Sequence, residues 1–147
     1  SSENARLTMI ANRRRDTQPE LRVRRLLHAA GLRYRVDVAP LRGLRSRADI
    51  VFTRQRIAVF IDGCFWHGCP AHGVAPKTNA EYWGPKLARN RARDLDVSKQ
   101  LAESGWAVLR FWEHEPPEDV ARIIMAQWRL SMNQPRSVGM ATVHSEK

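Results

Sequence analysis

An apolar run in the middle of the chain places the tightest limit on the fold. Ile57-Ala58-Val59-Phe60-Ile61 offers apolar side chains to both faces of an extended strand, because successive side chains of a strand point in opposite directions. A strand of this kind belongs in the centre of a sheet that is covered on both sides. We therefore expect a layered α/β domain with the strand 57–62 at its centre.

Weaker signals on either side of this run indicate the other elements. Thr17-Gln18-Pro19-Glu20 has the capping-box pattern of a helix start, and Gly31 stands where that helix should end. We expect further strands at 33–38, 49–53 and 106–112. A helix start at 78–81 should be broken at Gly84-Pro85, and a longer helix should then run from about Lys86 to Ser104. A last helix is expected on the apolar stripe Val120, Ile124 and Trp128. The order α, β, β, β, α, β, α predicts a mixed central sheet flanked by helices.

Length and hydropathy indicate one domain. The 147 residues suit a single core, which we assign to residues 16–131. Residues 1–15 are polar and end in Arg13, Arg14 and Arg15, so we expect a flexible basic arm there, and residues 132–147 should form a disordered tail. No apolar stretch approaches the roughly 20 residues of a membrane span, and the first residues lack the apolar core of a signal peptide. A cytoplasmic protein is therefore expected.

The charge of the chain is basic and unevenly distributed. Residues 1–56 carry fourteen arginines against five acidic residues, whereas residues 57–147 carry eleven basic and ten acidic residues. The net charge of +10 predicts an anionic partner, and arginine suits bidentate contacts to phosphate. Charge alone leaves acidic membrane surfaces and acidic proteins open, with nucleic acid the preferred partner.

Two cysteines and two histidines follow the central strand within nine residues: Cys64, His67, Cys69 and His72. In a cytoplasmic protein such cysteines are metal ligands or a redox pair rather than a disulfide. Sets of four thiolate and imidazole ligands suit tetrahedral zinc, and a turn can bring Cys64, Cys69 and His72 onto one ion, with His114 as the candidate fourth ligand. The alternative is a pair of ordinary cysteines beside surface histidines.

The same segment carries a resemblance to a known family. Phe60-Ile61-Asp62-Gly63-Cys64-Phe65-Trp66-His67 resembles the Gly-Cys-Phe-Trp-His signature of the very-short-patch-repair (Vsr) mismatch endonucleases. Flanking elements occur in matching order: Asp16-Thr17-Gln18-Pro19-Glu20-Leu21, Ala48-Asp49-Ile50-Val51, Glu81-Tyr82-Trp83, Asn90-Arg91-Ala92-Arg93-Asp94 and Gly105-Trp106-Ala107-Val108-Leu109-Arg110-Phe111-Trp112-Glu113. The resemblance covers residues 6 to 130.

This resemblance implies a restriction-endonuclease-like fold of the PD-(D/E)xK type with a structural zinc. It implies a monomer that nicks duplex DNA on the 5′ side of the thymine in a T:G mismatch, the product of 5-methylcytosine deamination. Carried over by position, Asp49 binds the catalytic magnesium together with the main-chain carbonyl of Ile61. His67 is then the general base, and Glu20 is a supporting acid near the metal and the attacking water.

The chemistry of phosphodiester hydrolysis agrees with these roles. The reaction needs a hard cation to offset the phosphate charge, and an aspartate at the start of a strand can present an oxygen ligand. It also needs a group that accepts a proton near neutral pH, as an imidazole does. Glu20 has a second interpretation, because its spacing from Thr17 also fits the closing residue of a capping box.

Two positions depart from the family pattern. Ala48 replaces the proline that usually precedes the metal-binding aspartate, which affects backbone stiffness more than chemistry. Asp62 stands where some members have a histidine. Its carboxylate either binds metal directly, as in ordinary PD-(D/E)xK nucleases, or caps the turn at Gly63.

Two sets of side chains are candidates for DNA contact. Phe65, Trp66 and Trp83 could insert beside the mispaired bases, since every base offers a face for stacking; core packing is the alternative. Lys86, Arg89, Asn90 and Arg93 recur at helical spacing and would form a polar, mostly basic stripe that contacts phosphates, with a merely solvated face as the alternative.

Two further functions remain open from the sequence. One is a nuclease with the same site that acts on another mismatch, a modified base or a defence substrate. The other is a zinc-stabilised DNA-binding module without catalysis, which would require Asp49 or His67 to be misplaced.

Overall fold

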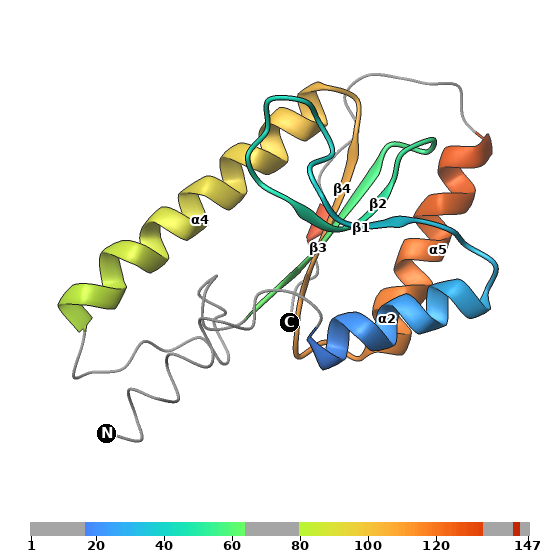
Figure 1. The fold of residues 1–147 in the computed structure, drawn as a ribbon, viewed down its shortest axis with the longest axis horizontal. Coiled ribbons are helices and arrows are strands. Elements are labelled where there is room, and N and C mark those ends of the chain that lie inside the picture. Colours follow the sequence, from blue (N-terminus) through green and yellow to red (C-terminus); the bar gives the residue numbers. More distant parts are fainter. Residues whose placement is uncertain (1–16, 64–79, 134–142, 145–147) are drawn as a thin grey trace.

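The computed structural model describes residues 17–63, 80–133 and 143–144, in which a mixed sheet lies between helices (Figure 1). The elements are α2 (Gln18–Ala29), β1 (Arg35–Val38), β2 (Ala48–Phe52), β3 (Ile57–Asp62), α4 (Ala80–Glu103), β4 (Ala107–Trp112), α5 (Pro117–Asn133) and β5 (Val143–His144). The predicted α/β class and the predicted order of elements from α2 to α5 are confirmed.

The sheet has the strand order β1-β2-β3-β4-β5, with β3 in the middle as its apolar sequence predicts. The pairs β1–β2 and β2–β3 are antiparallel, and Ile50 lies opposite Val59. The pair β3–β4 is parallel, from Ile57 beside Ala107 to Asp62 beside Trp112, and α4 makes the crossover that a parallel pair requires. The start of β2 and the ends of β3 and β4 therefore lie at one edge of the sheet.

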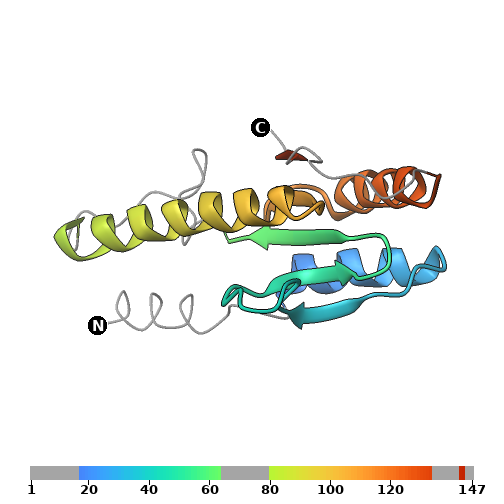
Figure 2. The same ribbon diagram turned by 90° about the horizontal axis from the view of Figure 1, so that it is seen from above.

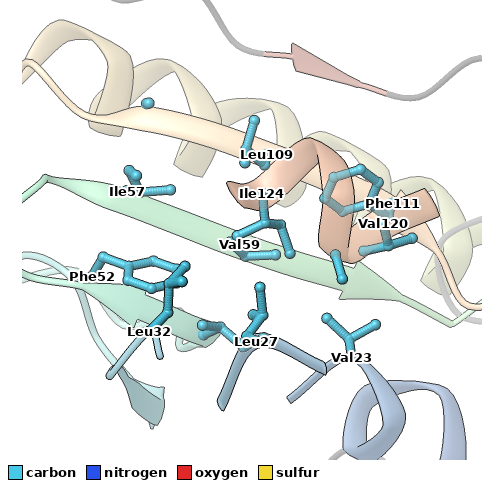
Figure 3. Close-up of a cluster of buried hydrophobic side chains, with 13 residues drawn as sticks. Val23, Leu27, Leu32, Phe52, Ile57, Val59, Leu109, Phe111, Val120 and Ile124 are labelled. Atoms are coloured by element: carbon cyan, nitrogen blue, oxygen red, sulfur yellow. The ribbon is translucent and has the colours of Figure 1, made fainter. Parts of the chain in front are cut away.

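Each face of the sheet is covered by a separate core. On one face, Val59 and its neighbours pack against Leu27 of α2 and Ile124 of α5 (Figure 3). On the other face, Ala58 and Phe60 pack with Val97 and Leu101 of α4. Alternate residues of β3 thus enter opposite cores, which explains why a strand without polar alternation is stable here.

Helix α4 reaches well beyond the sheet. Both views show its N-terminal half extending past the end of β3 (Figures 1 and 2), while its C-terminal half packs on the sheet through Val97 and Leu101.

The predicted helix break at Gly84-Pro85 is wrong, because α4 runs without interruption from Ala80 to Glu103 and includes Pro85. Proline removes one backbone donor and meets the carbonyl of the preceding turn. Pro85 is the sixth residue of α4, and the first four N–H groups of any helix have no intrahelical partner. The proline therefore costs one hydrogen bond near a helix end rather than dividing the helix.

The start of α2 also differs in detail from the capping-box prediction. Thr17 is the N-cap residue in extended conformation, yet its side chain makes no capping hydrogen bond. Pro19 occupies the first turn, where a missing N–H is harmless. Gly31, with φ of +92°, follows the helix end as predicted.

A two-residue strand, β5, comes from the segment predicted to be a tail. Val143 and His144 pair in parallel with Leu109 and Arg110 of β4. Among the residues that the structure describes, no helix is long and apolar enough to cross a membrane.

Candidate active site

A cavity of about 440 Å³ lies at the edge of the sheet where β2 begins and β3 and β4 end. The start of α2 and the projecting half of α4 complete its walls. Its charged lining consists of the acidic residues Glu20, Asp49, Asp62, Asp94 and Glu113 and the basic residues Arg47, Lys86, Arg89, Arg93 and Arg110. A cavity with carboxylates and cations in similar number can hold a metal ion and a phosphate together.

Asp49 is fixed at the inner wall of this cavity. Its Oδ2 accepts a hydrogen bond of 2.6 Å from the backbone N–H of Ile61 on the neighbouring strand. The N–H and C=O of one strand residue point to the same side, so the Ile61 carbonyl also faces the β2 side. One carboxylate and one carbonyl, with water, are hard oxygen donors that suit Mg²⁺. The donor set present therefore fits the predicted metal.

Asp62 lies in the same cavity wall but is engaged by an arginine. It is 4% exposed, and both of its oxygens accept hydrogen bonds from Nη1 of Arg110, at 3.0 and 3.2 Å. The two sequence interpretations, metal ligand and turn cap, did not include this ion pair. Neither of them is tested by it.

Glu20 is buried in the first turn of α2, with 2% of its surface exposed. Its Oε1 accepts a hydrogen bond of 2.6 Å from Nη2 of Arg24, one helical turn further on. The arginine offsets the cost of burying a carboxylate at this place. Glu20 lines the cavity together with Asp49, and its role as a supporting acid stays a prediction.

The outer walls of the cavity carry the cations. Lys86, Arg89, Asn90 and Arg93 line it from α4, so the structure brings the predicted stripe together on one surface. Arg47 lines the cavity from the loop between β1 and β2. Its guanidinium is exposed, and Nη1 lies 3.3 Å from Oδ2 of Asp37. A strand of nucleic acid in this cavity would have basic side chains on two sides.

Several predicted site residues lie outside the described residues: Arg13, Arg14, Arg15, Cys64, Phe65, Trp66, His67, Cys69 and His72. The backbone of Trp83 belongs to the first turns of α4, but its side chain is likewise outside. His114 is described; it is partly buried and follows the end of β4. Because Asp62 and Trp112 are neighbours across β3 and β4, His114 lies near the point where the chain enters the cysteine segment. The zinc set stays a prediction.

Four charged residues of the cavity lining were not predicted as site residues: Arg47, Asp94, Arg110 and Glu113. A signal existed for Arg110, because it is a lone charged residue in the apolar strand 107–112, and a buried arginine requires a partner. Arg47 and Glu113 belong to a loop and to a strand end, where sequence patterns carry little information about direction.

Comparison with known proteins places the chain in a family. The family model for the DNA mismatch endonuclease Vsr matches residues 2–72. The Type II nicking enzyme V.NaeI of Lentzea aerocolonigenes is 51% identical over 120 residues, which are 80% of this chain and 72% of that protein. V.XorIIP of Xanthomonas oryzae, also a Type II nicking enzyme, is 42% identical over 116 residues, 78% of this chain and 83% of the relative.

The DNA mismatch endonuclease Vsr of Escherichia coli is 42% identical over 101 residues, which are 67% of this chain and 62% of that protein. The family-model match covers the chain from α2 to the end of β3, which contributes Glu20, Asp49 and Asp62 to the cavity. The chain belongs to the Vsr family of DNA endonucleases.

Proposed function

We propose that this endonuclease nicks one strand of duplex DNA on the 5′ side of the thymine in a T:G mismatch, by magnesium-assisted hydrolysis of the phosphodiester. The observation that carries the proposal is the pairing of the Asp49 carboxylate with the Ile61 peptide inside a cavity with basic walls. The relatives support nicking and mismatch recognition, since they are named Type II nicking enzymes and DNA mismatch endonuclease.

In this proposal Asp49 and the Ile61 carbonyl hold Mg²⁺, which when bound would offset charge on the phosphate and on the attacking oxygen. The Asp49 carboxylate is oriented before substrate arrives because its Oδ2 already accepts the Ile61 N–H. A preset ligand avoids reorganisation during the reaction. Glu20, held by Arg24, would accept hydrogen bonds from water at the back of the cavity.

His67 takes the proton from the attacking water. An imidazole has the pKa that suits this role near neutral pH. His67 is five residues after Asp62, close enough along the chain to reach the cavity from the end of β3. Zinc on Cys64, Cys69, His72 and His114 would fix the segment that carries it.

Duplex DNA is held by the basic walls and read by the aromatic residues. Lys86, Arg89, Asn90 and Arg93 would contact phosphates from α4, with Arg13, Arg14 and Arg15 as a further basic arm. Phe65, Trp66 and Trp83 would stack beside the mispaired bases.

The proposal is tested by strand-resolved cleavage. Matched duplexes, duplexes with T:G and duplexes with each other mispair are labelled on one strand at a time and incubated with Mg²⁺. Wild-type protein should nick only the strand with the mispaired T, on its 5′ side. Asp49→Asn and His67→Ala should each lower the rate at least about hundredfold, whereas Lys99→Ala, an exposed change outside the cavity, should leave it unchanged.

A second candidate is nicking at another mispair or a modified base by the same site. V.NaeI and V.XorIIP are named Type II nicking enzymes, and nicking is the activity that this candidate shares with the first. Cleavage of another duplex in the same assay, still lost in Asp49→Asn, would establish this candidate. Tight binding of DNA without cleavage in any duplex would instead favour a non-catalytic module and would refute the catalytic proposal.

A further inference from the structure

A buried arginine lines the same cavity as the proposed metal ligand Asp49. Arg110 is 4% exposed, and its guanidinium lies 4.0 Å from the centre of the Phe60 ring. Its Nε donates to Oγ of Ser98 at 2.8 Å, and its Nη2 donates to the carbonyl of Asp94 at 3.3 Å. Arg110 thus connects β4 to α4 as well as to β3.

The contact with Asp62 uses both carboxylate oxygens. Nη1 of Arg110 lies 3.0 Å from one and 3.2 Å from the other, while the Asp94 carboxylate is further away, at 3.8 Å. Both partners of the main ion pair are almost fully buried, with side-chain exposures of 5% and 6%. A guanidinium stays protonated in proteins, so Asp62 faces a permanent positive charge.

Asp62 and Asp49 lie on the same side of the sheet. Residues two apart in a strand share a face, so Asp62 shares the face of Phe60, and Asp49 shares the face of Val51. Phe60 and Val51 belong to one core cluster, the one under α4. Both carboxylates also line the same cavity, so their position in its wall does not by itself say which of them binds an ion there.

We infer that Arg110 holds Asp62 in an ion pair and so keeps it out of the metal site. Of the two carboxylates Asp49 and Asp62, only Asp49 then binds the catalytic cation. Arg110 is a positioning residue in this arrangement. The inference rests on the proposed magnesium site at Asp49 and specifies its composition. It rejects the sequence interpretation of Asp62 as a metal ligand and leaves the turn-cap interpretation untested.

The physical reason is charge. A divalent cation on Asp62 would lie close to the buried guanidinium, where little water screens the repulsion. A site with one carboxylate and one carbonyl carries little negative charge, and Mg²⁺ sites of this kind are completed by substrate phosphate and water. Binding of the cation in the absence of DNA is therefore expected to be weak and to depend on Asp49.

The test is a Mn²⁺ titration of the full chain without DNA, followed through the electron paramagnetic resonance signal of free Mn²⁺. One equivalent of Zn²⁺ is added first to occupy the cysteine segment. Asp49→Asn should raise the Kd for Mn²⁺ at least tenfold, and Asp62→Asn should change it less than twofold. Thermal unfolding followed by circular dichroism verifies that each variant is folded.

If Asp62→Asn raises the Kd for Mn²⁺ as much as Asp49→Asn does, the inference is overturned and the proposed function stays intact. If neither substitution changes the Kd, Asp49 does not hold the cation, and the proposed function fails together with the inference. The two failures thus give different results.

A second pair of variants examines Arg110 itself. Arg110→Met should release Asp62 and lower the Kd for Mn²⁺ at least threefold, and the gain should disappear when Asp62→Asn is added. Removing one partner of a buried ion pair can unfold a protein, in which case the Asp62→Asn titration decides alone. An Arg110→Met protein that is folded and binds Mn²⁺ as the wild type does would contradict the inference.

Discussion

The basic residues of α4 give a quantitative prediction for DNA binding. Lys86, Arg89 and Arg93 are changed to alanine together, which removes three positive charges from one wall of the cavity. Phosphate contacts release counterions, so each lost contact lowers the dependence of binding on salt. A solvated face that does not touch DNA would leave that dependence unchanged.

The expected magnitude follows from the geometry of the helix. From Lys86 to Arg93 a helix rises about 10 Å, and phosphates of one strand advance about 3.4 Å each along the duplex. The stripe can therefore meet about three phosphates. At about 0.9 per contact, the slope of log K against log salt should decrease by about 2.7. When salt rises from 50 to 200 mM, the affinity of both proteins for DNA should fall, and the factor by which it falls should be about forty times smaller for the variant than for the wild type.

The assay is fluorescence anisotropy with a labelled mismatched duplex, in Ca²⁺ rather than Mg²⁺ to slow cleavage, at four salt concentrations. The matched control changes Arg91, Lys99 and Arg129 to alanine, three exposed residues that do not line the cavity. Both triple variants have the same net charge. Equal slopes for the two variants would refute the assignment of the α4 stripe to phosphate binding, since only long-range charge would then remain.

Three further predictions concern stability and ionisation. Leu27→Ala removes a side chain with 0% exposure from the core between α2 and the sheet, and it should lower the free energy of unfolding in urea by about 2–5 kcal/mol; a loss below 1 kcal/mol would contradict the packing. Gly105→Ala should cost about 1–2 kcal/mol because Gly105 has a φ of +85°, whereas Gly84→Ala inside α4, where an added Cβ meets nothing within 4 Å, should be neutral or stabilising. Burial raises the pKa of Tyr34 above its ordinary value of 10.0, against the smaller opposing effect of Arg24 and Arg33. The protonated Tyr34 side chain therefore stabilises the fold below pH 10.0, and this stabilisation is lost as the pH rises through the pKa of Tyr34 in the folded protein. A titration midpoint at or below 10.0, measured by absorbance and assigned to Tyr34 by its loss in Tyr34→Phe, would contradict this prediction.

The elements were predictable where one local pattern dominated. The run 57–61 marks a central strand because no other place in a domain accepts apolar side chains on both faces. The break at Gly84-Pro85 was wrong because the cost of a proline depends on its distance from the helix start, and Pro85 lies only five residues after Ala80, the first residue of α4. The same limit applies to the two-residue strand β5, which is too short to carry a pattern.

The site was predictable in its residue types and less so in its contacts. Asp49 and Ile61 are twelve residues apart, and their hydrogen bond depends on the register of β2 against β3. The partner of Asp62 lies 48 residues away on β4. No local pattern reports such a distance along the chain, although a single arginine within an apolar strand indicates that a buried acid must be near.

The pairing of β3 explains why the cavity lies at this edge and leads to a last prediction. Asp49 holds the Ile61 peptide from β2, and the N–H of Glu113 donates to the Asp62 carbonyl at 2.9 Å from the side of β4. The end of β3 is therefore held on both sides before the chain continues beyond Gly63. Substitution of an aromatic residue just beyond that point should change the choice of substrate without changing the ligands of the catalytic cation.

Phe65→Ala tests this separation, because Phe65 is two residues beyond the anchored end of β3. The variant should bind Mn²⁺ within twofold of the wild type and nick T:G duplexes with less preference over matched ones. Stacking on an aromatic side chain is worth about 1–3 kcal/mol per base, so the preference should fall about fivefold or more. Weaker Mn²⁺ binding in Phe65→Ala would mean that the metal ligands depend on the segment after Gly63, and that the strand pairing alone does not hold them.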